Sequence, residues 1–308
     1  DRGDFLVSLV QVLLSTFNGE RFLPALLDSL ATQTHPPVSV LVRDDGSRDG
    51  TTSVLERYAA MGALRWYQGR HVGVRRSFFD LLNRADGAAR AFAFCDQDDV
   101  WMPDKLERVH ARLEAAGSGQ PVLYCSRALV VDASLRPIGH TKPVRHGPSL
   151  GNALVENIAP GCTMVLNARA RVLLARHEPP RHVLHDAWAY LVVAALGQVI
   201  YDGHPTVMYR QHGGNLIGAR QRRWRYWLGR LRTFREDRLL RPFLGQAAEL
   251  ERLYGDELDA AGRRLVARFV RGRTGALRSL RYALRGEVYR QSTMDNLILK
   301  LLIALRQL

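Results

Sequence analysis

The chain has 308 residues, 46% of them hydrophobic, a composition that fits a folded protein and excludes long disordered tracts. Its longest apolar stretch, residues 187–196, is far shorter than the roughly 20 residues that a membrane-spanning helix needs. The net charge of +14 is concentrated in residues 205–308, which hold 22 Lys and Arg against 9 Asp and Glu, whereas residues 1–204 hold 22 against 21. This asymmetry predicts an anionic partner for the last third: a membrane surface, a phosphorylated acceptor or a nucleic acid.

The first 115 residues alternate between the periods of strands and helices. Short apolar, β-prone runs predict strands at residues 7–14, 38–42 and 91–95. Apolar residues recur at helical spacing at residues 22–30, 54–58 and 103–113. Asp49 is a plausible N-cap, Pro103 suits a first helical turn, and Gly117 suits a helix stop. The alternation predicts an α/β fold with a mixed, mostly parallel sheet flanked by helices.

The rest of the chain divides near residue 218. Further strands are expected at residues 122–131, 162–166, 199–201 and 207–209, and a helix at residues 186–196 that Gly197 closes. From Arg220 onward the pattern is helical and basic. We therefore expect a domain over residues 1–218 and a basic helical C-terminal region over residues 219–308.

The three cysteines, Cys95, Cys125 and Cys162, are widely separated and lie in apolar, strand-like contexts. No C-x-x-C pair or Cys/His cluster indicates a zinc site. Buried, reduced thiols and a cytoplasmic location are the expectation.

Three polar clusters directly follow predicted strands, at residues 15–20, 44–51 and 96–99. In open α/β sheets, ligands bind at the carboxyl ends of strands, so these clusters are expected to share one rim. Cluster 44–51 is also rich in ordinary turn and N-cap residues. Its functional interpretation is a carboxylate that accepts a hydrogen bond from a pyrimidine N–H.

The third cluster places Asp96, Asp98 and Asp99 within four residues. Their mutual repulsion is unfavourable unless a cation or water relieves it. Mg²⁺ or Mn²⁺ takes oxygen ligands and would neutralise a diphosphate leaving group. The alternative is a solvated acidic turn that caps the helix at Pro103.

Two further groups could carry chemistry. Asp186 opens the predicted helix at 186–196, where it is either an N-cap or a general base. His212 lies in a polar, glycine-containing loop after a short strand, where it is either structural or a metal ligand.

Six segments in this order resemble the family 2 glycosyltransferases, which have the GT-A fold, and are most similar to their bacterial rhamnosyltransferase-like branch. The segments read Leu-Ser-Thr-Phe-Asn-Gly-Glu, Arg-Asp-Asp-Gly-Ser-Arg-Asp-Gly-Thr, Cys-Asp-Gln-Asp-Asp-Val-Trp, Gly-Cys-Thr-Met, His-Asp-Ala-Trp and Tyr-Arg-Gln-His-Gly-Gly-Asn, and they begin at residues 14, 43, 95, 161, 185 and 209. The resemblance covers roughly residues 5–218.

The resemblance implies a nucleotide-sugar site. Thr16 and Glu20 would line the nucleotide pocket, and Asp44 would contact the base. Arg75 or Arg76 would reach the diphosphate.

The resemblance also implies the reacting groups. Asp96 and Asp98 would form the D-x-D pair, with Asp98 as a direct metal ligand and His212 as another. Asp99 would face a sugar, and Asp186 would be the catalytic base. The expected cofactor is Mg²⁺ or Mn²⁺.

One departure is visible, since His71 stands where the family usually has Asn, and His71 is therefore left out of the expected site. The implied reaction is an inverting transfer in cell-surface polysaccharide biosynthesis. The first expectation is L-rhamnose from dTDP-rhamnose, with UDP-hexoses open as donors and a saccharide or lipid-linked saccharide as acceptor.

Other functions fit the sequence less well. A nucleic-acid-binding protein would use the basic third, but no known nucleic-acid motif occurs and the acidic triplet would have no role. A nucleotidyltransferase would need a Gly-rich basic loop after the first strand, and residues 15–20 lack it. A catalytically dead homologue conflicts with the intact acidic and histidine motifs. We expect no nucleic-acid partner.

The basic third suggests membrane contact. Residues 222–227 interleave Arg with Trp and Tyr, and Leu297, Ile298, Leu301, Leu302 and Leu305 recur at helical spacing. Such a pattern suits an amphipathic helix in a membrane interface, or else a helical appendage with solvated arginines. The expected location is cytoplasmic, with peripheral contact at the inner face of the cell membrane.

Overall fold

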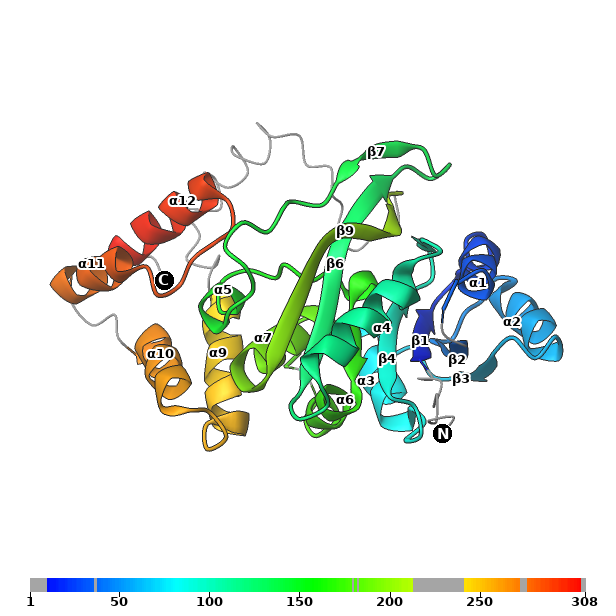
Figure 1. Ribbon diagram of the computed structural model, residues 1–308, viewed down its shortest axis with the longest axis horizontal. Coiled ribbons are helices and arrows are strands. Elements are labelled where there is room, and N and C mark those ends of the chain that lie inside the picture. Colours follow the sequence, from blue (N-terminus) through cyan, green and yellow to red (C-terminus); the bar gives the residue numbers. More distant parts are fainter. Residues whose placement is uncertain are drawn as a thin grey trace, which may run out of the picture.

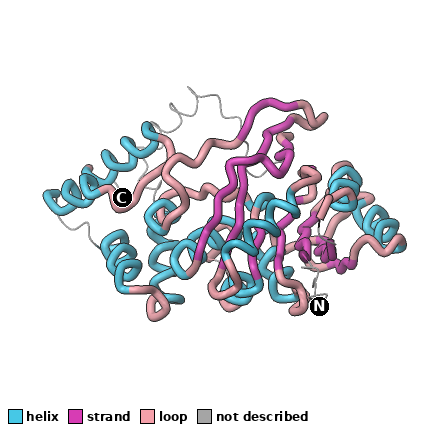
Figure 2. The backbone as a smooth tube through the Cα atoms, in the orientation of Figure 1, coloured by secondary structure: helices cyan, strands magenta, loops and turns pink. Residues whose placement is uncertain are grey.

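The computed structural model describes residues 10–35, 38–178, 180–181, 183–212, 241–271 and 276–305. One nine-stranded sheet runs through the molecule, with helices against both of its faces (Figures 1 and 2). The main strand order is β3-β2-β1-β4-β8-β6-β9-β5, and β7 pairs with β6 outside this path. The strands are β1 (Val10–Thr16), β2 (Val38–Asp44), β3 (Arg65–Gln68), β4 (Ala91–Asp96), β5 (Val100–Trp101), β6 (Val122–Val131), β7 (Pro137–His140), β8 (Val165–Asn167) and β9 (Gln198–Arg210).

The sheet is mixed, as expected. Strands β3, β2, β1 and β4 are parallel neighbours, and β6 is parallel to β9. The short strand β8 lies between β4 and β6 and is antiparallel to both. Strand β5 is antiparallel to β9, so it brings the segment after β4 beside the end of β9. The carboxyl ends of β1, β2 and β4 therefore meet at one edge.

Helices cover both faces of the sheet and enclose two hydrophobic cores. Their bounds are α1 (Leu23–Ala31), α2 (Thr51–Ala60), α3 (Val74–Arg84), α4 (Lys105–Ala116), α5 (Leu150–Ala153), α6 (Ala168–Ala175), α7 (His185–Leu196), α9 (Arg241–Tyr254), α10 (Ala260–Arg271), α11 (Ala276–Arg285) and α12 (Thr293–Ala304). One core lies under α1, α2 and α4. The other is shared by α3, α6, α7 and the C-terminal helices.

Strand β4 shows why the sheet is buried on both sides. Ala91, Ala93 and Cys95 point into the core under α1, α2 and α4, whereas Phe92 and Phe94 point into the other core. Successive side chains of a strand face opposite ways, so a strand covered on both faces reads as a continuous apolar run.

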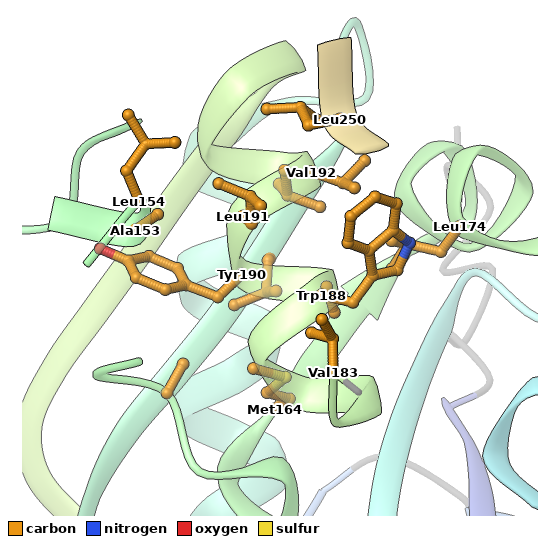
Figure 3. Close-up of a cluster of buried hydrophobic side chains, with 14 of the residues drawn as sticks. Ala153, Leu154, Met164, Leu174, Val183, Trp188, Tyr190, Leu191, Val192 and Leu250 are labelled. Carbon is orange, nitrogen blue, oxygen red and sulfur yellow. The ribbon is translucent and has the colours of Figure 1, made fainter. Parts of the chain in front are cut away.

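Helix α7 anchors the second core. Trp188, Tyr190, Leu191 and Val192 are all buried, and Val192 lies beside Leu250 of α9, whereas Tyr190 lies beside Ala153 of α5 (Figure 3). The absence of a polar face explains why residues 187–196 form the longest apolar stretch of the sequence. Gly197 ends the helix, as expected.

Several expected boundaries differ from the structure. The strand expected at residues 162–166 is a 3₁₀ turn at Gly161–Thr163 followed by β8. The two short strands expected at residues 199–201 and 207–209 are the single strand β9, whose register against β6 shifts near Arg127. Helix α2 has Gly50 rather than Asp49 at its N-cap, and α4 begins after Asp104, beyond Pro103. The stop at Gly117 is confirmed.

The cysteines are free and buried, which confirms their expected state. Within the described part of the chain, no helix is both long and apolar enough to span a bilayer.

Residues 213–240 lie outside the described residues, and with them the predicted boundary at 218 and the basic-aromatic run at 222–227. Helices α9–α12 contribute Leu250, Phe269 and Ile303 to the same core as α7.

Candidate active site

A cavity of about 640 Å³ opens at the edge where β1, β2 and β4 end. This volume lies within the range of small-molecule sites, roughly 300–1,000 Å³. Seven segments supply its walls: the ends of β1, β2, β4 and β9, the loop after β3, the segment before β8, and the start of α7. Its lining includes Ser15, Phe17, Asp45, His71, Gly73, Asp96, Gln97, Asp98, Asn157, Gly161, Cys162, His185, Asp186 and Tyr209.

Gln97 ties the loop after β4 to the loop after β1. Its Oε1 accepts hydrogen bonds from Thr16 Oγ1 at 2.7 Å and from the Phe17 amide at 2.8 Å, and its Nε2 donates to the Phe17 carbonyl at 3.1 Å. Thr16 is buried and supports the wall from behind, while Phe17 lines the cavity. Sequence reasoning left Gln97 out, although its position inside the acidic cluster was the available signal.

The two carboxylates that end β2 have different surroundings. Asp44 is fully buried and accepts hydrogen bonds from Ser47 and from Gln68 Nε2, the latter at 3.0 Å. Asp45 lines the cavity and accepts from the amides of Val72 and Gly73, both at 2.9 Å. Asp45, and not Asp44, lines the cavity. The contact expected between Asp44 and a base therefore stays a prediction.

His71 is a cavity residue that the sequence analysis left out. Its ring centroid lies 4.3 Å from that of Phe17, and its Nδ1 lies 2.9 Å from Oδ2 of Asp45. Gly73 follows with a φ of +81°, which lets the chain turn from this loop into α3. Two aromatic side chains in the lining of a cavity suit the flat face of a nucleobase.

The acidic cluster comes together as expected, in a poorly solvated place. Burial, together with the charges of Asp98 and Asp186, raises the pKa of Asp96 to about 7. Burial also raises the pKa of Asp99, whose Oδ1 accepts from the Arg210 amide at 3.0 Å. No hydrogen-bond donor in the described part of the chain meets Oδ2 of Asp99. Carboxylates crowded in this way gain from a bound cation.

The ligand atoms of Asp96, Asp99 and Cys162 lie within 4.8 Å of one another. The expected pair of Asp98 and His212 is also brought together, with Oδ2 and Nε2 2.7 Å apart. The antiparallel pairing of Val100 with Met208 carries this arrangement, because it aligns the segment after β4 with the end of β9. His212 also stacks on Phe22, with ring centroids 4.7 Å apart.

A buried cation lies beneath the acidic cluster. Lys105 is fully buried at the start of α4, and its Nζ donates to the Cys162 carbonyl at 2.7 Å. The ammonium lies 3.8 Å from the centre of the Trp101 ring. Burial lowers the pKa of Lys105 to about 8. Lys105 was not among the expected site residues, since a lysine in the first turn of a helix is ordinarily exposed.

Asp186 lines the cavity at the N-terminus of α7. Its Oδ2 accepts from Asn157 Nδ2 at 2.9 Å, and its Oδ1 accepts from the Ala187 amide at 2.7 Å. Asp186 is close enough to Asp96 to raise the pKa of that carboxyl. The candidate base and the candidate cation ligands therefore share one cavity.

His185, next to Asp186, lies between aromatic rings. It stacks on Phe78 with centroids 4.0 Å apart and meets Phe94 edge-on. Burial lowers the pKa of His185 to about 4, so the imidazole is neutral near pH 7. Gly161 leaves room for it, because a Cβ at this position would lie 2.8 Å from the His185 Nε2.

Three further expected donor-side residues, like Thr16, Asp44 and Asp99, are not part of the cavity lining. Arg75 and Arg76, at the start of α3, are bonded to Glu178 at 2.6 and 2.7 Å. Glu20 is exposed and accepts from the Gly50 amide at 3.0 Å, which links the loops after β1 and β2. Their expected contacts with a nucleotide diphosphate stay predictions.

Known proteins resemble this chain in sequence. Residues 11–143 match the family model described as Glycosyl transferase family 2. The dTDP-rhamnosyl transferase RfbG of Shigella flexneri is 24% identical over 220 residues, which are 67% of this chain and 74% of that protein. The putative teichuronic acid biosynthesis glycosyltransferase TuaG of Bacillus subtilis is 32% identical over 102 residues, or 32% of this chain and 40% of that protein.

Solved structures resemble it in fold. TarS 1–349 of S. aureus in complex with UDP aligns with a TM-score of 0.58 at 15% identity, over 86% of this chain and 71% of that one. The mannosyltransferase PcManGT of Pyrobaculum calidifontis, in complex with GDP-Man and Mn²⁺, aligns with a TM-score of 0.51 at 17% identity, over 98% of this chain and 86% of that one. The expected GT-A fold is thereby confirmed, and the match of residues 11–143 to Glycosyl transferase family 2 agrees with the resemblance found in the sequence.

Proposed function

We propose that this protein transfers one sugar from a nucleotide diphosphate to an acceptor hydroxyl, with inversion at the anomeric carbon. The observation that carries the proposal is the shared cavity of Asp186, Asp96 and Asp98. Asp186 would take the proton from the attacking hydroxyl, and the nucleoside diphosphate would leave from the opposite face of the sugar. A single displacement of this kind inverts the anomeric centre.

The donor chemistry fits a divalent cation, Mg²⁺ or Mn²⁺. The unpartnered Oδ2 of Asp99 and the crowding of three carboxylates support it. Asp98 and His212, with Asp96, would hold the ion, which would neutralise the diphosphate when bound. The relative PcManGT was solved with Mn²⁺ and GDP-Man, in accord with this assignment.

The donor we favour is dTDP-rhamnose, and a UDP-hexose is the alternative. Support for rhamnose comes from the likeness to RfbG at 24% identity, and support for a uridine carrier from TarS, which was solved with UDP. Phe17 and His71 would hold the base, since both rings lie at the cavity wall. The acceptor would be a saccharide or a lipid-linked saccharide of a cell-surface polysaccharide, and the protein would act in the cytoplasm at the inner face of the membrane.

The test begins with thermal unfolding in the presence of dTDP, UDP and GDP, each with and without Mn²⁺. A cation-dependent rise in Tm with one pyrimidine nucleotide is expected, because binding to the native state alone raises its stability. Turnover of the matching nucleotide sugars should then follow, and NMR of the product should show inversion. Retention of configuration would overturn the mechanism, and no stabilisation by any nucleotide would overturn the donor site.

A further inference from the structure

An exposed apolar surface covers helices α11 and α12. It consists of Leu277, Leu280, Leu284, Met294, Leu297, Leu301 and Leu305, and it is called the hairpin face here. These are seven of the twelve exposed large apolar side chains among the described residues, although α11 and α12 are a small part of the chain. Leu277 and Leu284 are each 73% exposed. Such a concentration of apolar surface marks an interaction site.

The hairpin face is a regular product of helical spacing. In α11 the leucines lie at positions i, i+3 and i+7, and in α12 the four apolar residues follow the same spacing, so each set forms one stripe. The opposite side of each helix is buried, through Tyr282 and Ala283 in α11 and Leu299 and Ile303 in α12. The two helices are therefore fixed to the domain core and still present leucines outward.

This surface corrects the expected membrane stripe. Ile298 and Leu302, expected to face a membrane, turn inward, with Leu302 only 7% exposed. Met294 replaces them on the outer side, and α11 adds a second stripe that the sequence analysis did not anticipate. Figure 1 shows α11 and α12 side by side at the end of the molecule opposite α1 and α2.

The charge around the hairpin face identifies its partner. Residues 260–305 contain ten Lys and Arg against two acidic residues, Glu287 and Asp295, a net of +8. Arg278, Arg281 and Arg285 of α11 are all exposed beside the leucines. A second copy of the chain would bring the same positive charge to the contact and be repelled, whereas a layer of anionic headgroups would be attracted.

We propose that the hairpin face inserts its leucines into the interface of an anionic lipid membrane, with the arginines of α11 at headgroup level. Leucines would reach the boundary between headgroups and acyl chains, and the guanidinium groups would contact lipid phosphates. The membrane surface does not depend on the donor sugar. Only the step from this surface to a lipid-linked acceptor rests on the proposed function.

Hydrogen bonds link α12 and the residues just before it to the segment that leads to the candidate base. Lys142 Nζ donates to Asp295 Oδ2 at 3.0 Å, and Gln291 Oε1 accepts from the amides of Arg145 and His146 at 2.9 and 2.8 Å. The same segment continues to Asn157, which bonds Asp186. The inner side of the hairpin is thus bonded to the segment that leads to Asn157, while its outer side would face the membrane that carries a lipid-linked acceptor.

Vesicle flotation with the whole chain tests the proposal. Wild-type protein should bind vesicles of phosphatidylcholine mixed with phosphatidylglycerol, and bind phosphatidylcholine alone much less. Leu280→Gln with Leu301→Gln should weaken binding on the order of tenfold or more, because two leucines that would be buried in the membrane are lost. Arg281→Gln should weaken only the anionic component, by about fivefold, the equivalent of roughly 1 kcal/mol per basic residue at the surface.

The matched control is Met61→Gln with Val172→Gln, two exposed apolar residues outside the hairpin face, of which Met61 directly follows α2 and Val172 lies in α6. This variant should bind vesicles like the wild type. Nucleotide-dependent thermal stabilisation of every variant shows that its fold and donor site are intact, so loss of vesicle binding is separated from loss of function.

Insertion can also be observed directly. The native cysteines are buried, so a cysteine introduced by Leu280→Cys or Leu301→Cys can be labelled with a polarity-sensitive dye. A blue shift with anionic vesicles is expected at both positions and not at Met61→Cys. Absence of a shift, vesicle binding unchanged in the double leucine variant, or conversion of a wild-type dimer to monomer by that variant would overturn the proposal. Binding to RNA without binding to vesicles would overturn it as well.

Discussion

His212 Nε2 lies 2.7 Å from Asp98 Oδ2, although 114 residues separate the two in the chain. The contact depends on strand pairing, because β5 runs antiparallel to the end of β9. Asp98 belongs to the loop after β4 that also carries Asp96, and His212 follows β9. The contact therefore joins the loop after β4 to the end of β9 at the candidate cation site.

Replacing either partner should remove cation-dependent donor binding. We expect Asp98→Asn and His212→Ala each to lower kcat/KM by about 100-fold or more, since a cation offsets charge on the leaving group. The double variant should lose little beyond the single ones, because both act through one ion. Mn²⁺ titration with and without nucleotide measures the effect.

The matched control for this pair is His204→Ala, because His204 and Asp104 form a His–Asp contact at 3.2 Å outside the cavity lining. Its Mn²⁺ titration and turnover should equal those of the wild type. Full additivity of Asp98→Asn and His212→Ala would show that the two residues act independently.

Asp186→Asn should stop transfer while donor binding persists. A fall in kcat of about 10³ is expected, within the range for loss of a general base, with the nucleotide-induced rise in Tm retained. Asn157→Ala should lower kcat by about tenfold, because it removes one hydrogen bond that orients the carboxylate. Single-turnover kinetics measures both, and Asn83→Ala, an exposed amide on α3, is the control. An Asp186→Asn variant with near wild-type turnover would exclude this base.

Gly161→Ala should disturb the base through its neighbour. The added Cβ would lie 2.8 Å from His185 Nε2 and 3.4 Å from the Asp186 Cβ, so α7 or the loop must shift. A displacement of a few tenths of an ångström should reduce kcat by roughly ten- to a hundredfold. Gly203→Ala is the control, because no atom lies within 4 Å of its added Cβ. Equal kcat values for the two variants would contradict the tight contact.

The fold should lose stability in mild acid through His185. The unfolded imidazole takes up a proton near its ordinary pKa of 6.5, whereas the buried one does so only near 4. Proton uptake below about pH 6.5 therefore favours the unfolded chain. The free energy of unfolding falls by at most about 3 kcal/mol as the pH is lowered from above 6.5 to below 4.

Denaturant unfolding between about pH 7 and pH 5 measures this dependence. His185→Phe should flatten the slope of unfolding free energy against pH, and His140→Phe, at an exposed position of β7, should leave it unchanged. The slope is the readout, because the larger ring also alters packing. An unchanged slope in His185→Phe would assign the acid sensitivity to other groups.

Much of this arrangement could be predicted from the sequence because its causes are local. The apolar runs before Asp44 and Asp96 predict buried strands, and parallel strands end at a common edge. The Asp-Gln-Asp-Asp segment predicts a crowd of carboxylates without knowledge of the fold, although the segment alone also fits a solvated acidic turn. The end of α7 at Gly197 also follows from local chemistry.

The remainder depends on contacts that no local pattern encodes. β9 reads as two strands because Gly203 and Pro205 interrupt it, yet pairing with β6 continues across the irregularity. Lys105 is buried because Trp101 and the Cys162 carbonyl receive it, and they come from other elements. His71 faces the cavity because the amides after it bind Asp45, an interaction between two loops.

The position of β8 has a consequence for how the protein is made. This strand lies between β4 and β6, and β9 completes the far side of β6. When residues 11–143 have left the ribosome, the whole family-matched segment has been made, but β8 and β9 have not. The edge of β4 that pairs with β8 and the edge of β6 that pairs with β9 are then still exposed. Assembly of the sheet must wait until β9 emerges, so the nascent chain depends on slow, long-range pairing and has most need of a chaperone in that interval.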